Sequence, residues 1–297
     1  MRRNALAPGS IRIGTAGFKY ADWKGAFYPA RLPDRDMLRF YAECFDALEI
    51  NYTYYQMPSP KTLEAMARKA GGQITFSVKA HGDMTHRREN LQAAAPPFRE
   101  AIRALEDRQA LGCVLAQFPY SFWNTRPNRE HLLRLREALV GVPLVIEFRN
   151  ASWYTSPVFA FLREQAIGFC CVDEPDLPNL PPRVVEATGA VGYVRFHGRA
   201  AAKWWDHTEA AERYDYLYAE GELEEWVPKI QTLAAQTRVT FLFFNNHPRG
   251  KAAANAYIMK HRLGLPVGKV PRTLIQQFPA LKALSTEETP PGELPLS

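Results

Sequence analysis

Four short apolar runs of the sequence carry polar or charged side chains at every second position. Residues two apart on a strand share a face. The polar positions that share a face are Glu49 with Asn51, Ser77 with Lys79, Glu147 with Arg149, and Arg195 with His197. The residues between them are apolar. We therefore expect the polar face to line an interior and the apolar face to pack against helices.

These residue types suit acid–base chemistry on an anion. Carboxylates and imidazoles transfer protons, whereas lysine and arginine bind phosphate or carboxylate groups. The expected catalytic residues are Glu49, Glu147, Asp173 and His197, and the expected anion-binding residues are Lys79, Arg149 and Arg195. Gln117 and Asn245, at the last positions of their runs, extend this cluster. Two structural alternatives stay open: internal pairing, for example of Glu147 with Arg195, and a hydrogen-bonded core role for His197.

A divalent metal is a further alternative, because Glu147, Asp173 and His197 end three successive runs and are suitable ligand types. Against it, the sequence has no HxH or HExxH spacing, and the last run ends in Asn245 and Asn246. GxGxxG and Walker phosphate loops and a GxSxG turn are also missing. The sequence therefore leaves the cofactor open. The first expectation is that there is no cofactor, and a divalent metal is the alternative.

Aromatic residues follow several of the runs and offer faces for stacking on a ring, a sugar or a base. Tyr20 follows the first run, Tyr55 the second and Trp153 the fifth. We expect these three to contact the ligand, although aromatic residues of this kind more often pack loops together.

The elements that must position these residues are eight apolar runs that read as strands: residues 11–17, 46–51, 74–80, 112–118, 143–148, 168–173, 192–197 and 239–245. Segments with helical periodicity lie between most of them, at 61–69, 98–107 and 129–139. Ser59-Pro60 and Ser156-Pro157 each place a capping hydroxyl before a proline at a helix start. Alternating strands and helices predict a parallel sheet, and closure leaves no exposed edge. The sequence thus predicts a (β/α)8 TIM-barrel-like single domain over residues 1–284, with an open doubly wound sheet as the alternative.

Two segments interrupt the alternation of strand and helix. Residues 174–190 are rich in proline, and residues 199–223 are aromatic and charged. Both follow strands, so both could fold over a site at the strand ends. Residues 285–297 have little apolar content, and we expect a flexible tail there.

The formal net charge of +6 favours anionic ligands. No run of five or more basic residues occurs, so nucleic acid is an alternative partner rather than the first expectation. Cys44, Cys113, Cys170 and Cys171 show no paired-motif spacing and are expected in the core. No leader or membrane span is expected, which makes the cytoplasm the default location and a membrane partner unexpected. The oligomeric state is left open.

At these residues the sequence resembles the YecE-like family, also called domain of unknown function 72. The matching stretches are Ile13-Gly-Thr-Ala-Gly17, Trp23-Lys-Gly-Ala-Phe-Tyr-Pro29, Leu48-Glu-Ile-Asn51, Thr53-Tyr-Tyr55, Phe76-Ser-Val-Lys79, Thr85-His86, Leu115-Ala-Gln-Phe-Pro119, Ile146-Glu-Phe-Arg149, Ser152-Trp153, Val194-Arg-Phe-His-Gly-Arg199 and Phe244-Asn-Asn246. The resemblance implies a TIM-barrel-like fold with a pocket at the strand ends and supplies no reaction. His86 and Asn246, which lie within the matching stretches, are also expected to contact the ligand. Ala16 and Phe18 depart from the family pattern, in which serine and tryptophan are commoner.

Together these observations lead to one hypothesis with two alternatives. The first is an acid–base enzyme, a hydrolase, lyase or isomerase, acting on a phosphorylated or otherwise anionic small molecule at the carboxyl ends of the strands. The second is a metal-dependent phosphodiesterase or nuclease acting on nucleic acid. The third is a non-catalytic ligand-binding barrel.

Overall fold

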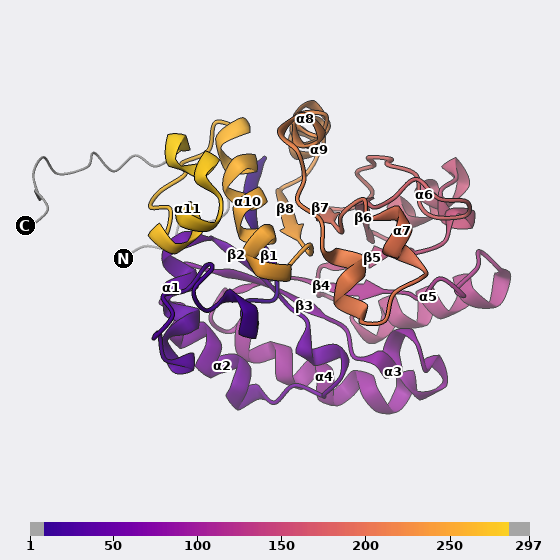
Figure 1. The fold of residues 1–297 in the computed structure, drawn as a ribbon. Helices are drawn as coiled ribbons and strands as arrows, with labels where there is room; N and C mark the ends of the chain where they lie inside the picture. Colours follow the sequence, from indigo (N-terminus) through magenta and orange to yellow (C-terminus); the bar gives the residue numbers. More distant parts are fainter. Residues whose placement is uncertain (1–8, 285–297) are drawn as a thin grey trace, which may run out of the picture.

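The computed structural model describes residues 9–284 and shows eight parallel strands closed into one barrel (Figure 1). The strands are β1 (Ser10–Ala16), β2 (Ala47–Ile50), β3 (Thr75–Lys79), β4 (Leu111–Gln117), β5 (Leu144–Glu147), β6 (Gly168–Asp173), β7 (Val191–Phe196) and β8 (Val239–Phe244). Each pairs with the next along the chain, and β8 pairs with β1. Every predicted run matches its strand to within one residue at each end. The expected (β/α)8 fold is confirmed, and the open sheet is wrong.

Helices surround these strands (Figure 1). They are α1 (Met37–Cys44), α2 (Pro60–Lys69), α3 (Gly82–Thr85), α4 (Leu91–Glu106), α5 (Arg126–Ala138), α6 (Ser156–Glu164), α7 (Ala201–Trp204), α8 (Glu220–Glu224), α9 (Val227–Ala235), α10 (Lys251–Arg262) and α11 (Arg272–Gln277). Residues 174–190, which connect β6 to β7 and are described in full, contain no helix. Proline in this connection removes backbone donors and disfavours a helix there.

One of the two predicted helix starts is confirmed and the other is displaced. The Ser59 hydroxyl accepts a hydrogen bond from the backbone N–H of Thr62 at 3.2 Å, and Pro60 begins α2. The residue before α6 is Thr155, so Ser156 lies inside the first turn and its predicted capping role is wrong. The proline signal located both helices to within one residue.

The barrel interior is apolar along most of its length. Its buried side chains are Ala47, Cys113, Leu115, Val145, Cys170, Val172, Val191, Tyr193, Val239, Phe241 and Phe243. The intervening positions, such as Leu48, Phe76 and Ile146, belong instead to the larger cluster packed under the helices. This confirms the predicted alternation of faces, and all four cysteines are buried as expected.

Strand register places polar positions of neighbouring strands side by side in the carboxyl half of the barrel. Glu49 of β2 is opposite Ser77 of β3, and Gln117 of β4 is opposite Glu147 of β5. Paired residues of neighbouring parallel strands point to the same face, so these side chains share the interior.

Two other expectations concern the ends of the chain and the membrane. Residues 285–297, expected to form a tail, lie outside the described residues. Between residues 9 and 284, none of the helices is both long and apolar enough to cross a bilayer.

Candidate functional site

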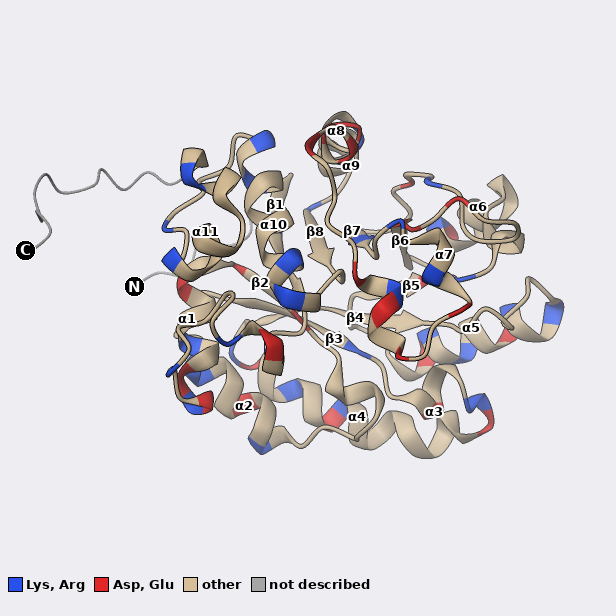
Figure 2. Cartoon of the chain, in the orientation of Figure 1, with Lys and Arg blue, Asp and Glu red and all other residues tan. Residues whose placement is uncertain are grey.

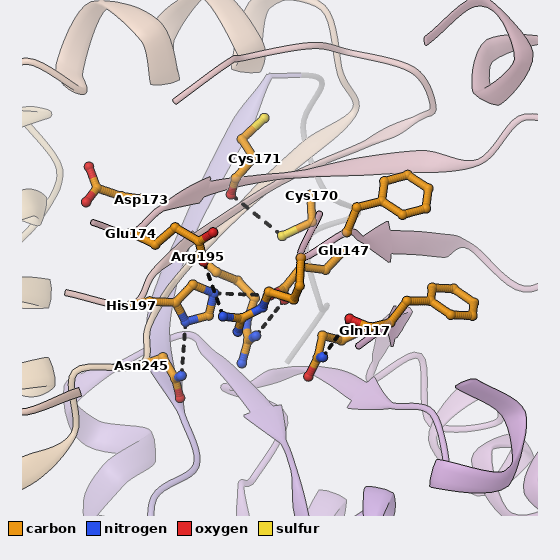
Figure 3. A network of polar contacts seen from close by, with 12 residues as sticks. Gln117, Glu147, Cys170, Cys171, Asp173, Glu174, Arg195, His197 and Asn245 are labelled. Atoms are coloured by element: carbon orange, nitrogen blue, oxygen red, sulfur yellow. Dashed lines mark hydrogen bonds and ion pairs between the residues drawn. The ribbon is translucent and has the colours of Figure 1, made fainter. Parts of the chain in front are cut away.

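Arg195 of β7 lies at the centre of the site, between two glutamates. Its guanidinium donates to Glu147 Oε2 at 2.6 Å (Figure 3). It also donates to Glu49 Oε1 at 2.7 Å, and the Tyr193 hydroxyl donates to the second oxygen of Glu49 at 2.7 Å. All of these side chains are buried. The internal pairing that the sequence left open is therefore present, and it neutralises charge that would be costly to bury alone.

Arg149 extends this pairing to a third glutamate. It forms an ion pair with Glu147 Oε1, and its Nη1 donates to Glu174 Oε2 at 3.2 Å. Burial alone would raise the pKa of Glu147. The positive charges of Arg149 and Arg195 lower this pKa by a larger amount, so it lies well below its usual range. Glu174 differs, because burial raises its pKa to about 8 against the opposing effect of Arg149. We call Glu49, Glu147, Arg149 and Arg195 the buried ion-pair network, and Glu174 accepts a hydrogen bond from it.

His197 completes the bonding of Glu147. Its Nε2 lies 3.2 Å from Glu147 Oε1, and the Asn245 side-chain amide donates to its Nδ1 at 3.0 Å (Figure 3). An amide donor at Nδ1 places the ring proton on Nε2, where it is donated to the glutamate. Burial holds the pKa of His197 well below its usual value, with Arg149 adding to the effect. His197 is therefore a neutral donor at pH 7.

Lys79 lies beside the network, and within residues 9–284 it forms no ion pair. Its Nζ donates to Gln117 Oε1 at 2.8 Å and sits 4.8 Å from the centre of the Tyr54 ring. Burial lowers the pKa of Lys79 to about 8, and the positive charge of Arg195 adds to this effect. The lysine thus has a neutral acceptor in place of a carboxylate, and its proton is easily lost.

Arg149 also lines a cavity of about 250 Å³, which we call the Arg149 cavity. Its lining residues are His86, Gln117, Pro119, Tyr120, Arg149, Leu180, Trp204, Trp205, Arg213 and Tyr214. Two arginines and no carboxylate stand among these described residues. Burial lowers the pKa of His86 to about 4, so this histidine is neutral at pH 7. Arg149 already pairs with Glu147, so it is Arg213, with no described carboxylate partner, that gives the Arg149 cavity the electrostatic character of an anion site.

A second cavity, of about 430 Å³, lies between the loops that follow β1 and β2. Glu49, Tyr20 and Asn51 are among its lining residues. The Tyr20 hydroxyl donates to the Ala16 carbonyl, and its ring stacks on His247 with 4.3 Å between centroids. Asn51 Oδ1 is buried without a hydrogen-bond partner among the described residues. Tyr20 and Asn51 are thus placed at this second cavity and away from the lining of the Arg149 cavity.

Asp173 does not join the cluster, which corrects the sequence expectation. Its carboxylate accepts from Arg199, from the Tyr218 hydroxyl at 2.8 Å and from the Trp226 ring N–H at 2.6 Å. Figure 3 shows it pointing away from Glu147 and His197. On β6 the inward positions are Cys170 and Val172, so the alternation places Asp173 on the helix side and Glu174 inside.

Three further expected contacts are structural or exposed. Trp153 is fully buried, stacks on Phe148 at 4.3 Å and donates to the Phe122 carbonyl, so it packs loops together. Asn246 is buried and donates to the Asn255 side chain. Tyr55 is 83% exposed and lies outside both cavities. None of these three lines the site.

The metal alternative fails on the same geometry. Glu147 and His197 are close, but Asp173 faces the opposite side of the sheet, and Arg195 occupies one oxygen of Glu147. Throughout residues 9–284 no group of three or more His, Cys, Asp and Glu side chains is arranged to hold a metal ion. Glu147, Asp173 and His197 therefore do not form the metal site that the sequence left open.

Sequence reasoning missed two groups of site residues. Glu174 follows Cys170 and Val172 at the strand period, so continuing the alternation past the end of the run would have found it. Trp205, Arg213 and Tyr214 lie in the interrupting segment 199–223, which does fold over the strand ends. No periodicity marks individual residues in such a segment, so only its composition gave a signal.

Comparison with known proteins finds one family over most of the chain. The sequence profile described as "Protein of unknown function DUF72" matches residues 12–280. UPF0759 protein YunF of Bacillus subtilis is 28% identical over 281 residues, covering 89% of this chain and 99% of YunF. The expected resemblance is therefore confirmed.

Solved structures of the same family share the fold. A DUF72 family protein of Thermotoga maritima is 39% identical, with a TM-score of 0.80, and the match covers 86% of this chain and 99% of that protein. A DUF72 family protein of Enterococcus faecalis is 25% identical, with a TM-score of 0.76, over 86% of this chain and 96% of that one. These two structures support the fold, and their descriptions name no reaction.

Proposed function

Because the chain belongs to the DUF72 family of proteins of unknown function, we propose its function from the site itself: an enzyme that performs acid–base chemistry on a phosphorylated or otherwise anionic small molecule. The ligand binds in the Arg149 cavity, at the carboxyl ends of the strands. This is the face on which TIM-barrel enzymes carry their reactions.

The observation that carries the proposal is the charge of the Arg149 cavity. Arg149 belongs to its wall and to the buried ion-pair network, so its side chain is held in place before a ligand arrives. Arg213, also in the wall, donates to the Trp204 carbonyl at 3.0 Å and forms no ion pair with any carboxylate that the structure describes. Two fixed guanidiniums suit a phosphate or carboxylate group.

We assign proton transfer to Glu174 and Lys79, which lie directly behind the wall of the Arg149 cavity and are hydrogen-bonded to its wall residues Arg149 and Gln117. Glu174 Oε1 is buried without a hydrogen-bond partner in the described chain, and a pKa of about 8 keeps the carboxyl protonated at pH 7. Lys79, also with a pKa of about 8, holds a proton at pH 7 and releases it with a small pH change. Groups that titrate near the working pH are effective general acids and bases.

The other expected catalytic groups then act as positioning residues. Both oxygens of Glu49 and both oxygens of Glu147 already have partners, which leaves them poorly placed to accept a proton from substrate. His197 is neutral and donates to Glu147. We infer that these three residues hold Arg149 and Arg195 in place.

The first experiment is mass spectrometry of the purified protein under non-denaturing conditions, followed by denaturation and identification of released molecules. A co-purified phosphorylated or carboxylated compound supports the proposal. Parallel metal analysis tests the phosphodiesterase alternative, which stoichiometric zinc or manganese would favour. A ligand that binds but is never transformed would favour the non-catalytic barrel.

A substitution at Arg213 tests the anion site directly. Removing a charge-assisted hydrogen bond costs about 1.5–3 kcal/mol, so Arg213→Gln should weaken binding of inorganic phosphate roughly 10- to 100-fold in calorimetry. Arg126→Gln is the matched control, because that side chain is 92% exposed and pairs only with Glu130 on its own helix. Equal phosphate affinity of Arg213→Gln and the wild-type protein would contradict the anion site.

A further inference from the structure

Part of the wall of the Arg149 cavity is aromatic. Tyr120, Trp205 and Tyr214 line it together with the two arginines. The rings of Tyr120 and Trp205 meet edge to face, with 5.3 Å between centroids and 71° between planes. The cavity therefore presents ring surfaces next to its positive charges.

Two neighbouring tryptophans in this wall have different surroundings. Trp204 is 1% exposed and lies under the Arg213 guanidinium, 5.3 Å from the ring centre. Trp205 is 54% exposed, and the aromatic ring that meets it among the described residues is that of Tyr120. Trp204 thus fixes the segment, whereas Trp205 leaves a large apolar surface at the cavity in contact with water. Ligand pockets are typically lined by apolar and aromatic side chains beside a few polar groups, and Trp205 beside the two arginines fits this pattern.

We propose that the ligand of the Arg149 cavity is a nucleoside phosphate, with its phosphate held by Arg149 and Arg213 and its base stacked on the exposed ring of Trp205, next to Tyr120. This inference rests on the proposed function and names its substrate class. A base presents a flat π-face that stacks on indole and phenol rings, and the phosphate supplies the charge that the arginines need. A volume of about 250 Å³ is near the lower end of ordinary ligand pockets, which favours one nucleotide over a longer strand.

The test compares ligands that differ only in the base. Uridine 5′-monophosphate, adenosine 5′-monophosphate and ribose 5-phosphate are titrated calorimetrically into the full-length protein. Stacking of one base on an aromatic side chain should make one of the nucleotides about 5- to 100-fold tighter than ribose 5-phosphate. If neither nucleotide exceeds ribose 5-phosphate, the base inference is wrong while the anion proposal stands.

Substitution of Trp205 locates the effect. Trp205→Leu keeps an apolar side chain and removes the ring, so nucleotide affinity should fall to that of ribose 5-phosphate, whose own affinity stays within about twofold. Trp123→Leu is the matched control, because Trp123 is 46% exposed and contacts Tyr120 but does not line the cavity. Trp205→Phe, which retains a smaller ring, should keep part of the preference. Full nucleotide preference in Trp205→Leu would overturn the assignment of the stacking residue.

Two further ligands complete the test. The first distinguishes failure of the anion site from failure of the stacking surface, and the second distinguishes a free nucleotide from the end of a nucleic-acid strand. Binding of an uncharged nucleoside, without binding of phosphate or ribose 5-phosphate, would keep the stacking surface and refute the anion site. A short 5′-phosphorylated single strand distinguishes a free nucleotide from a strand end. We expect it to bind no tighter than the mononucleotide, and a gain above tenfold would assign the nucleoside phosphate to nucleic acid.

Discussion

Lys79 and Glu174 are two ordinary residues brought to nearly the same pKa from opposite directions. Burial disfavours the charged form of either, so it lowers the pKa of Lys79 to about 8 and raises that of Glu174 to about 8. The largest charge effect on each pKa comes from a guanidinium: Arg149 opposes the shift at Glu174, and Arg195 adds to the shift at Lys79. At pH 7 the site thus holds an ammonium and a neutral carboxyl, a state that favours anion binding.

This state predicts that anion affinity falls as the pH rises through about 8. Lys79 then loses a positive charge, Glu174 gains a negative charge, and the two changes have the same sign. Each coupled proton changes a binding constant by up to roughly tenfold per pH unit, so we expect at least about a tenfold loss from about pH 7 to about pH 9. Calorimetry with inorganic sulfate measures the effect, because the charge of sulfate is constant in this range.

The control is the double variant Lys79→Met with Glu174→Gln, which should bind sulfate with a nearly flat pH profile. The amide of glutamine keeps the shape of Glu174 and an oxygen for Arg149. A flat profile in the wild-type protein would show that neither group titrates near pH 8 at the binding site.

At the scale of the elements, the strands were predictable and the loops were not. Each strand is a short apolar run whose alternate residues face either the barrel interior or the helices. This two-residue period is visible in the sequence itself. The alternation also placed Glu49, Glu147 and Arg195 on the inner face. Asp173 was misplaced because its position at the end of the run was used in place of the alternation, which points to Glu174.

The aromatic and basic residues of the Arg149 cavity could not be assigned one by one. Trp205 and Arg213 lie in a segment held by tertiary contacts, and such contacts join residues distant in sequence without any periodic pattern. Proline signals found the starts of α2 and α6, but they could not show that Thr155 precedes α6. Features that depend on a single strand or helix could therefore be predicted from the sequence, whereas residues placed by loop packing could not.

Asp173 anchors this segment to the barrel, which gives a prediction at the same scale. Its carboxylate accepts from Arg199, Tyr218 and Trp226, all of which follow β7 in the chain. Hydrogen bonds to a buried charged group contribute about 1.5–3 kcal/mol each, so Asp173→Ala should lower the free energy of unfolding by about 3 kcal/mol or more. Urea denaturation measures this loss, and limited proteolysis should show faster cleavage within residues 199–226.

Asp34→Ala is the control for Asp173→Ala, because Asp34 forms ion pairs with Lys19 and Lys24 at the surface. It should leave both urea denaturation and proteolysis unchanged. If Asp173→Ala kept its stability and protease resistance but lost anion binding, Asp173 would be a ligand contact and the anchoring role would be wrong.

On the scale of the whole molecule, the Arg149 cavity lies in a chain that carries more positive than negative charge. The formal net charge is +6, and Lys and Arg are spread over most of the described helices (Figure 2). The largest share on a described helix is that of α10, which carries three basic residues and no Asp or Glu. The positive field is therefore diffuse, and at short range it is the two arginines of the Arg149 cavity that select the anion.

This division between a diffuse field and local contacts predicts how salt acts on binding. A diffuse field attracts an anion over distances that salt screens, since the Debye length falls from about 30 Å at 0.01 M to about 10 Å at 0.1 M. Stopped-flow tryptophan fluorescence with a nucleoside monophosphate should show an association rate constant that falls roughly threefold to tenfold over this range, while dissociation changes less than twofold. An uncharged nucleoside, the control, should associate at a rate independent of salt. The opposite result would be that salt accelerates dissociation and leaves association unchanged. The contacts inside the Arg149 cavity would then account for all of the electrostatic attraction, and the net charge of the chain would not guide the ligand to the cavity.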